Sequence, residues 1–271
     1  MKIICTVKYV PDVDKFQFDF EKNVVVRHNI RMILNPDDTK AVGLALAMKK
    51  SDPKVKVEVL CMGPKSVLPM AKDLIRMGVD QVTLLSDARF VGSDSYITSK
   101  ILGTYLYKQK ADLILTGSHS LDGDTSHVPS QVADFLSLPH MTGVTEFHLS
   151  GMEQGRVEFT SENELKRIRF SMKLPGILSL SKDAKYKLPY IRYEDVNLNV
   201  DQFIQTLTLE DLDLDIAEVG LQGSLTKVKR TFVKEYKLRN QEVIGTDEDG
   251  IERIYQFLKN NGYIGGKKYA E

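Results

Sequence analysis

A polar segment that directly follows an apolar run is the part of this sequence best suited to chemistry. Leu113–Leu115 is apolar, and Ser118–Ser126 after it has the sequence SHSLDGDTS. A buried parallel strand that ends in a short glycine-containing turn and then opens a helix presents backbone N–H groups. These groups and the helix dipole behind them favour phosphate. The segment therefore indicates a nucleotide or flavin site.

The acidic residues of this segment restrict how such a site could be built. Asp122 and Asp124, together with Asp94 before the preceding helix, would repel a diphosphate unless they face sugar hydroxyls, an adenine edge or helix N–H groups. We therefore expect backbone amides and hydroxyl groups, rather than lysines, to surround the phosphates. The candidate hydroxyls are those of Ser95, Thr98 and Thr125.

Other catalytic chemistries have little support in the sequence. There is no Walker lysine motif and no G-x-G-x-x-G after the first strand, so neither ATP hydrolysis nor Rossmann-type NAD binding is indicated. His119 and His127 flank the acids but lack a third metal ligand at a fixed spacing, so we expect hydrogen-bonding or solvent-facing histidines. Neighbouring Ser118, His119 and Ser120 cannot form a catalytic triad. We expect no metal site and no catalytic side chain.

Composition limits the class of protein. The 271 residues include 37 acidic and 37 basic side chains, so no overall charge attracts nucleic acid or a membrane surface. No run approaches the ~20 apolar residues of a membrane-spanning helix, and no signal peptide precedes the first strand. Cys5 and Cys61 lie in apolar runs, as reduced buried thiols do. We expect a soluble, cytoplasmic protein.

Strand-like and helix-like segments alternate through the first ~140 residues, which predicts a mostly parallel sheet with helices on both faces. The expected strands are Ile3–Val7, Val55–Cys61, Gln81–Leu85 and Ala111–Thr116, and the helices begin near Pro36, Pro64, Ser93 and Val128. Asn35 is a suitable N-cap for the first helix. A small hairpin, Phe16–Phe20 with Val24–Val26, precedes it.

Four strand-to-helix turns should meet at the carboxyl edge of this sheet, where open α/β sheets bind ligands. They are Lys8–Asp12, Met62–Pro64, Phe90–Ser95 and Ser118–Thr125. Small residues at such turns also occur in α/β proteins without a nucleotide.

The pattern changes after Pro139. Alternation of apolar and polar residues predicts three antiparallel strands that extend the sheet, Val144–Leu149, Arg156–Thr160 and Glu164–Met172, followed by a buried strand at Leu174–Leu180. From about Asn197 we expect an extended arm with one late helix. That helix has Thr246 as its N-cap and an apolar face of Ile251, Ile254, Tyr255 and Leu258. The expected organisation is an α/β nucleotide-binding domain, residues 1–200, and a C-terminal arm, residues 201–271, that packs on a partner subunit.

Three groups of motifs together resemble the β subunit of electron transfer flavoproteins over about the first 190 residues. The first is Val7–Asp12 with Ile33–Asp38. The second is Met62–Pro64 with Arg76–Asp80 and Leu84–Asp87. The third is Leu121–Thr125 with Gln131 and Leu138-Pro139. The resemblance implies a fold like that of flavodoxins or adenine-nucleotide α-hydrolases, and an α subunit as partner.

Two segments resemble the electron-bifurcating type of this family: Phe90–Ser95 leading into Thr98-Ser99, and Asp122–Thr125, which reads DGDT. That type implies FAD, reduced by NADH, in place of the structural AMP of the common type. It also implies ferredoxin and a flavin-dependent dehydrogenase as electron acceptors. The resemblance gives the cofactor-binding residues as Thr6, Asn35, Asp38, Met62, Ser95, Thr98, Asp122, Gly123, Asp124, Thr125 and Val128.

Lys8 and a loop after the last buried strand complete the candidate set. Lys8 could place a cation near a reduced flavin, or be an ordinary lysine at a turn. The loop Lys182–Pro189 resembles the family's partner-recognition loop: it keeps Tyr186, Leu188 and Pro189 but lacks the usual proline and arginine. Leu188 is the expected apolar anchor. The altered loop leaves open an acyl-CoA or a lactate dehydrogenase as partner.

Two other functions remain open. The chain could be a non-bifurcating scaffold that binds structural AMP and docks the α subunit, or a free-standing adenine-nucleotide sensor.

Overall fold

The computed structural model describes residues 1–12, 17–19, 24–26, 31–149, 155–163, 165–227 and 243–264. The chain divides into two compact units, residues 1–227 and 228–271. The first unit therefore extends beyond the expected boundary at residue 200.

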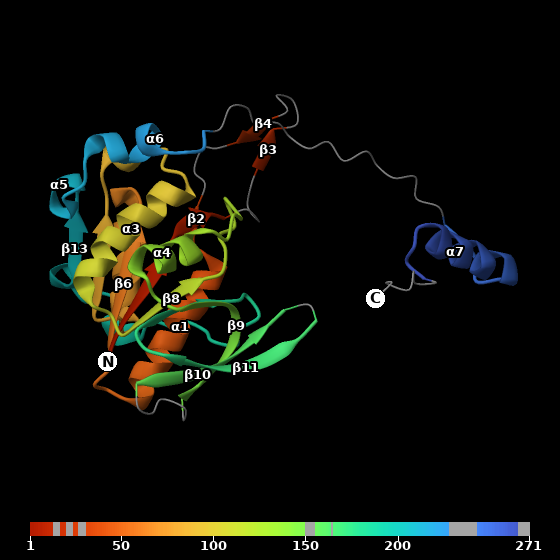
Figure 1. Ribbon diagram of the computed structural model, residues 1–271, viewed down its shortest axis with the longest axis horizontal. Helices are drawn as coiled ribbons and strands as arrows, with labels where there is room; N and C mark the ends of the chain where they lie inside the picture. The colour runs from red at the N-terminus through yellow and green to blue at the C-terminus, as the bar shows by residue number, and fades with distance from the viewer. Residues whose placement is uncertain are drawn as a thin grey trace. The chain divides into compact units, whose positions relative to one another are not determined.

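In the described part of the first unit, nine strands form one sheet in the order β11-β10-β9-β12-β8-β1-β6-β7-β13 (Figure 1). From β9 to β13 in this order all neighbours are parallel, and β9, β10 and β11 pair antiparallel. The strands are β1 (Lys2–Val7), β6 (Lys56–Met62), β7 (Gln81–Leu85), β8 (Leu113–Gly117), β9 (His140–His148), β10 (Arg156–Glu162), β11 (Arg167–Lys173), β12 (Gly176–Leu180) and β13 (Ile204–Leu207). The predicted α/β class and its antiparallel extension are confirmed.

Helices cover both faces of this sheet. They are α1 (Pro36–Ser51), α2 (Leu68–Arg76), α3 (Ser95–Gln109) and α4 (Val128–Leu136). In β1, Ile3 and Cys5 belong to the core cluster that includes α1 and α2 residues, whereas Ile4 belongs to the cluster with α3 and α4. A central strand buried on both faces explains why Ile3–Cys5 of β1 is apolar without alternation.

Two short strand pairs lie before α1. The predicted hairpin is present as β3 (Gln17–Asp19) paired antiparallel with β4 (Val24–Val26), and the predicted flanking Phe16 and Phe20 lie outside the described residues. The pair β2 (Tyr9–Pro11) and β5 (Met32–Leu34) was not expected from the sequence. Three-residue strands are too short to produce a periodic pattern.

The segment expected to begin the arm instead contributes a strand to the sheet. β13 pairs in parallel with β7, from Ile204 opposite Val82 to Leu207 opposite Leu85. Its four residues, IQTL, carry no clear alternation, so pairing with β7 rather than local pattern defines this strand. The short helices α5 (Leu209–Leu212) and α6 (Gly220–Gly223) follow it.

The second unit contains the predicted late helix, α7 (Glu248–Asn260). Its N-cap is Asp247 and not Thr246, because the Asp247 side chain accepts the N–H of Gly250 at 3.1 Å. Ile251, Ile254 and Tyr255 of the expected apolar face are exposed. None of the helices in the described residues is long and apolar enough to cross a membrane.

Candidate functional site

A cavity of about 420 Å³ lies where strands and helices meet at the carboxyl edge of the sheet. β1, β6 and β8 end there, and α1, α3 and α4 begin there. Its wall includes Lys8 after β1, Met62 at the end of β6, the turn before α3 and the β8–α4 loop, so parts of all four predicted strand-to-helix segments meet here. Its size falls in the range of ~300–1,000 Å³ that is usual for small-molecule sites.

Most of the predicted cofactor-binding residues line this cavity. They are Thr6, Lys8, Asn35, Asp38, Met62, Ser95, Thr98, Gly123, Thr125 and Val128. Asp122 and Asp124 lie on the same loop but not in the wall. Residues that the prediction did not include also line it, among them Phe90, Ser118, His119 and Ser120.

The wall combines a polar part with an apolar part. Hydroxyl groups gather at the start of α3 (Ser93, Ser95, Thr98) and on the β8–α4 loop (Ser118, Ser120, Thr125, Ser126). Apolar side chains line the remainder (Val7, Met62, Phe90, Leu102, Val128, Pro129). A ligand with a phosphate-bearing end and a flat apolar ring, such as an adenosine phosphate, matches both parts.

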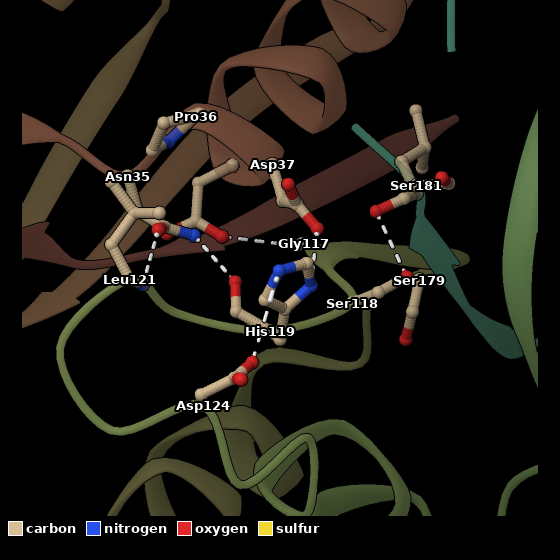
Figure 2. Close-up of polar contacts among 12 residues, drawn as sticks. Asn35, Pro36, Asp37, Gly117, Ser118, His119, Leu121, Asp124, Ser179 and Ser181 are labelled. Atoms are coloured by element: carbon tan, nitrogen blue, oxygen red, sulfur yellow. Dashed lines mark hydrogen bonds and ion pairs between the residues drawn. The ribbon is translucent and has the colours of Figure 1, made fainter. Parts of the chain in front are cut away.

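Asn35 holds the β8–α4 loop rather than the helix that it precedes. It is the N-cap of α1, but its side chain makes no capping hydrogen bond. Instead its Nδ2 donates to the carbonyl of His119 at 2.7 Å, and its Oδ1 accepts the N–H of Leu121 at 3.2 Å (Figure 2). Asn35 therefore fixes the loop that forms one wall of the cavity.

Asp38 ties β1 and β8 to the start of α1. Its carboxyl oxygens accept the N–H of Lys8 at 2.7 Å and the N–H of Gly117 at 3.1 Å. Burial raises the pKa of Asp38 to about 7, although both N–H donors favour the charged form. The approach to β8 is close, because a Cβ at Gly117 would lie 2.3 Å from Asp38 Oδ1.

Lys8 and Asp122 form an ion pair beside the cavity. Nζ of Lys8 lies 2.6 Å from Oδ2 of Asp122, and both side chains are partly exposed. Partial burial alone would raise the pKa of Asp122, but contact with Lys8 outweighs it and the pKa is lowered. The charge of Lys8 is therefore compensated within the protein.

His119 lies between two carboxylates. Its Nδ1 is 2.9 Å from Oδ2 of the buried Asp37, and its Nε2 is 3.8 Å from Oδ1 of Asp124 (Figure 2). Burial raises the pKa of Asp37, and the nearby His119 opposes that rise. Asp124 has a backbone φ of +46°, a left-handed conformation at the turn of the loop. In the sequence, His119 has Asp122 and Asp124 nearby, whereas Asp37 is far away. The contact between His119 and Asp37 could therefore not be predicted.

Asp94 closes the other side of the cavity. Its side chain caps α3 by accepting the N–H of Ile97 at 2.9 Å, and it also accepts the N–H and hydroxyl of Thr226, each at 2.9 Å. Ser224 Oγ accepts the Asp94 N–H at 2.9 Å. These donors outweigh the effect of partial burial and lower the pKa of Asp94, so the carboxylate is charged and its oxygens are engaged by N–H and hydroxyl groups.

The predicted partner-binding residues lie on the segment after β12, with mixed exposure. Tyr186 is half-buried, and its hydroxyl accepts the N–H of Phe147 at 2.7 Å. Leu188 is half-buried against the core, and Pro189 is exposed. Tyr190 and Tyr193, which the prediction did not include, are 96% and 97% exposed.

Comparison with known families decides what this architecture belongs to. The electron transfer flavoprotein domain matches residues 22–184, more than half of the chain. The chain belongs to the electron transfer flavoprotein family. The predicted resemblance is therefore confirmed at the level of the family.

Several relatives of this electron transfer flavoprotein chain align over nearly its whole length. "Electron transfer flavoprotein subunit beta" of Clostridium acetobutylicum is 29% identical over 264 residues, 97% of this chain and 100% of the relative. The "Caffeyl-CoA reductase-Etf complex subunit CarD" of Acetobacterium woodii is 33% identical, over 91% of this chain and 93% of its own. The "Acryloyl-CoA reductase electron transfer subunit gamma" of Anaerotignum propionicum is 29% identical, over 97% of this chain and 100% of the relative.

Proposed function

We propose that this chain is the β subunit of a cytoplasmic, bifurcating electron transfer flavoprotein, with FAD in the cavity at the carboxyl edge of the sheet. The observation that carries the proposal is the convergence of the family-implied nucleotide residues on one cavity. It is lined by hydroxyls on one side and by apolar side chains on the other. The names of the chain's relatives, which include electron transfer flavoprotein β subunits, support the same assignment.

The residues present fit the adenosine phosphate part of such a cofactor. Ser95 and Thr98 in the first turn of α3 can donate hydroxyl hydrogens to phosphate oxygens, where the helix N-terminus also favours negative charge. Of the acids nearby, Asp122 pairs with Lys8, and Asp38 and Asp94 accept backbone N–H groups. These contacts offset part of the repulsion that a phosphate would meet.

A bound flavin would supply hydride acceptance from NADH and the release of single electrons to separate acceptors. The protein's contribution is to hold and orient. The β8–α4 loop, fixed by Asn35, shapes one wall, and the start of α3 binds phosphate. Lys8 provides a cation at the end of β1, already balanced by Asp122. No side chain need act as an acid, base or nucleophile.

We propose ferredoxin as one electron acceptor and, through the FAD of an α subunit, a flavin-dependent dehydrogenase as the other. The names of two relatives mention caffeyl-CoA reductase and acryloyl-CoA reductase. These favour a partner that acts on a CoA ester over one that acts on lactate.

Two surfaces are proposed for the partners. The exposed apolar side chains of α7, in the unit of residues 228–271, suit an arm that packs on the α subunit. The segment with Tyr186, Leu188 and Pro189, extended by the exposed Tyr190, is proposed to contact the dehydrogenase.

The second candidate is a non-bifurcating β subunit with structural AMP. One observation favours it. The cavity of about 420 Å³ is lined by hydroxyl groups and apolar side chains, and an adenosine phosphate alone matches both kinds of lining. AMP and FAD share that part, so the wall by itself does not choose between them.

Identification of the bound nucleotide tests the proposal. The complex with its α subunit, purified and acid-extracted, is expected to release two FAD per heterodimer and no AMP. NADH added without a dehydrogenase should bleach the flavin rapidly. One FAD and one AMP per heterodimer, with slow bleaching, would assign the scaffold function instead.

A further inference from the structure

The last segment of the first unit packs behind one wall of the cavity. We call residues 219–226, which include α6, the strap. Val219 is buried in the same core cluster as Phe90, a residue of the cavity wall. The Leu221 N–H donates to the carbonyl of Val91 at 3.2 Å, so the strap lies against the turn that precedes α3 (Figure 1). Among the described residues that line the cavity, none belongs to the strap.

Two glycines allow the strap to approach the wall. Gly220 has a φ of +60°, and a Cβ there would overlap with the carbonyl oxygen of Arg89. Gly92, which lines the cavity, has a φ of +81°, and a Cβ there would lie 3.0 Å from Cβ of Leu221. Glycine accepts both the left-handed backbone and the short distance.

Two hydroxyl side chains of the strap bind residues of the wall. Oγ of Ser224 accepts the N–H of Asp94 at 2.9 Å and lies 3.1 Å from the carbonyl oxygen of Gly92. The N–H and the hydroxyl of Thr226 both donate to Oδ2 of Asp94, each at 2.9 Å. The other oxygen of Asp94 caps α3 through the N–H of Ile97. Since Gly92 and Asp94 line the cavity, the strap bonds to the wall itself.

These bonds fix the turn from Gly92 to Ser95 from behind. Ser224 is buried, so water does not readily replace its hydroxyl as a partner of the wall. Release of the strap would leave the N–H and Oδ2 of Asp94 without these partners and the turn less constrained. A ligand that contacts the turn in one arrangement binds less tightly when the turn samples several.

We propose that Ser224 and Thr226 are positioning residues of the nucleotide site: the strap holds the wall from Gly92 to Ser95, and nucleotide binding and fastening of the strap stabilise each other. The inference rests on the proposed nucleotide site and holds for FAD and AMP alike. The factor by which the fastened strap raises nucleotide affinity must equal the factor by which bound nucleotide stabilises the fastened strap. The first unit ends at residue 227, so a bound nucleotide also stabilises the point from which the chain continues into the second unit.

Calorimetry with AMP, on the nucleotide-stripped complex of the full chain with its α subunit, tests the effect of the strap on affinity. Ser224→Ala removes a buried hydroxyl and should raise the dissociation constant about tenfold. Thr226→Val keeps the backbone donor and should raise it about threefold, whereas Thr226→Ser keeps the hydroxyl and should bind as the wild type does. Thr208→Val is the matched control and should keep wild-type affinity. The N–H and hydroxyl of Thr208 donate to one oxygen of Asp211 in the same arrangement, outside the cavity wall.

Hydrogen exchange of the wild-type complex tests the reciprocal effect without a substitution. At saturating AMP, exchange of the Leu221 and Thr226 N–H groups should slow about tenfold, because these groups bond to the wall. The Thr208 N–H should exchange at the same rate with and without AMP. Unchanged exchange at Leu221 and Thr226, or wild-type affinity in Ser224→Ala, would overturn the inference.

FAD is the second probe, and it separates the strap from the cofactor assignment. If AMP binds and FAD does not, the FAD assignment fails, and the AMP data still test the strap. If FAD binds and AMP does not, the same variants are compared with FAD. If the β subunit of the wild-type complex binds neither nucleotide, both the proposed site and the role of the strap are wrong.

Discussion

The side chain of Asn35 has a different role from the helix capping that its position indicates. Asn-Pro at the start of a helix is a capping signal, and Asn35 does precede Pro36 of α1. The side-chain amide nevertheless bridges to His119 and Leu121 on a loop more than eighty residues away. The backbone position follows from local sequence, and the hydrogen-bonding partners follow from the fold.

Replacing Asn35 should loosen the nucleotide site. Asn35→Ala removes two hydrogen bonds to the loop, so we expect unfolding free energy to fall by about 1–2 kcal/mol and AMP affinity to fall about tenfold. Urea unfolding and calorimetry measure the two effects. Asn199→Ala, which loses one local bond to the N–H of Asp201 far from the cavity, is the control and should leave affinity unchanged. Equal affinity loss in both variants would contradict the role given to Asn35.

Asp38 should impose a pH dependence on stability. Its pKa is about 7 in the folded chain against 3.8 for the unfolded group, so the unfolded chain releases this proton first as pH rises. The contribution of Asp38 to stability is complete below pH ~4 and is lost as pH rises through ~7. In urea titrations, the stability lead of the wild type over Asp38→Asn should therefore shrink between pH 4 and pH 8. A constant difference would show that Asp38 does not titrate in this range.

The candidate site could be predicted from the sequence to the level of its loops, but not of its contacts. The family resemblance supplies Thr6, Met62, Thr98 and Gly123, and the fold brings these residues to one cavity at the sheet edge. The contact of His119 with Asp37 could not, because it joins two elements that are distant in sequence. Only the packing of α1 against β8 brings them together.

Among the elements, the packing of α1 on β8 leaves no space for a side chain at one point. A Cβ on Gly117 would lie 2.3 Å from Asp38 Oδ1 and 2.9 Å from the Asp38 backbone nitrogen. This explains why β8 ends in glycine beside the buried start of a helix. The requirement is one of distance, since the conformation of Gly117 is not left-handed.

Gly117→Ala should be strongly destabilising. Since backbone atoms of α1 cannot move aside as a flexible side chain can, we expect a loss of more than about 3 kcal/mol, or insoluble protein. Gly63→Ala is the control, because no atom lies within 4 Å of a Cβ there, and it should change the unfolding free energy by less than about 1 kcal/mol. Thermal and urea unfolding of both variants measure this, and similar values for the two would refute the close approach.

Elements with a strong internal pattern could be predicted from the sequence, and those defined by pairing could not. α1 begins at Pro36 as its cap and acidic first turn indicate, and α4 spans Val128–Leu136 as expected. β13 could not be predicted because its four residues form a strand only through their pairing with β7. The sequence predicts the cap of α7 one residue early, because Thr246 and Asp247 are both good N-cap residues and only the helix geometry distinguishes them.

For the whole molecule, the surface after β12 offers a contact for a partner. Leu188 packs partly on the core, whereas Tyr190 is almost fully exposed. Truncation of Leu188 therefore affects stability as well as any partner contact. Tyr190 is the cleaner position at which to test docking.

Tyr190→Ala should slow electron transfer to the partner dehydrogenase at least about fivefold, because an exposed tyrosine is a frequent anchor of interfaces. NADH reduction of the flavin and the melting temperature should not change. Tyr107→Ala, also at an exposed tyrosine (74%), is the control on α3 and should leave transfer at the wild-type rate. A fall in NADH reduction equal to the fall in transfer would assign Tyr190 to the structure instead.

The outer strand β11 has a consequence for how copies of this protein meet one another. It ends the sheet on one side, and its exposed face carries Arg167, Arg169 and Lys173. Arg169 pairs with Glu158 on the neighbouring β10, and Arg167 pairs with Glu146 on β9, one strand further in. A strand from another molecule that paired there would have to displace water from this charged row. Such a row therefore disfavours the pairing of β11 with a strand of a second molecule.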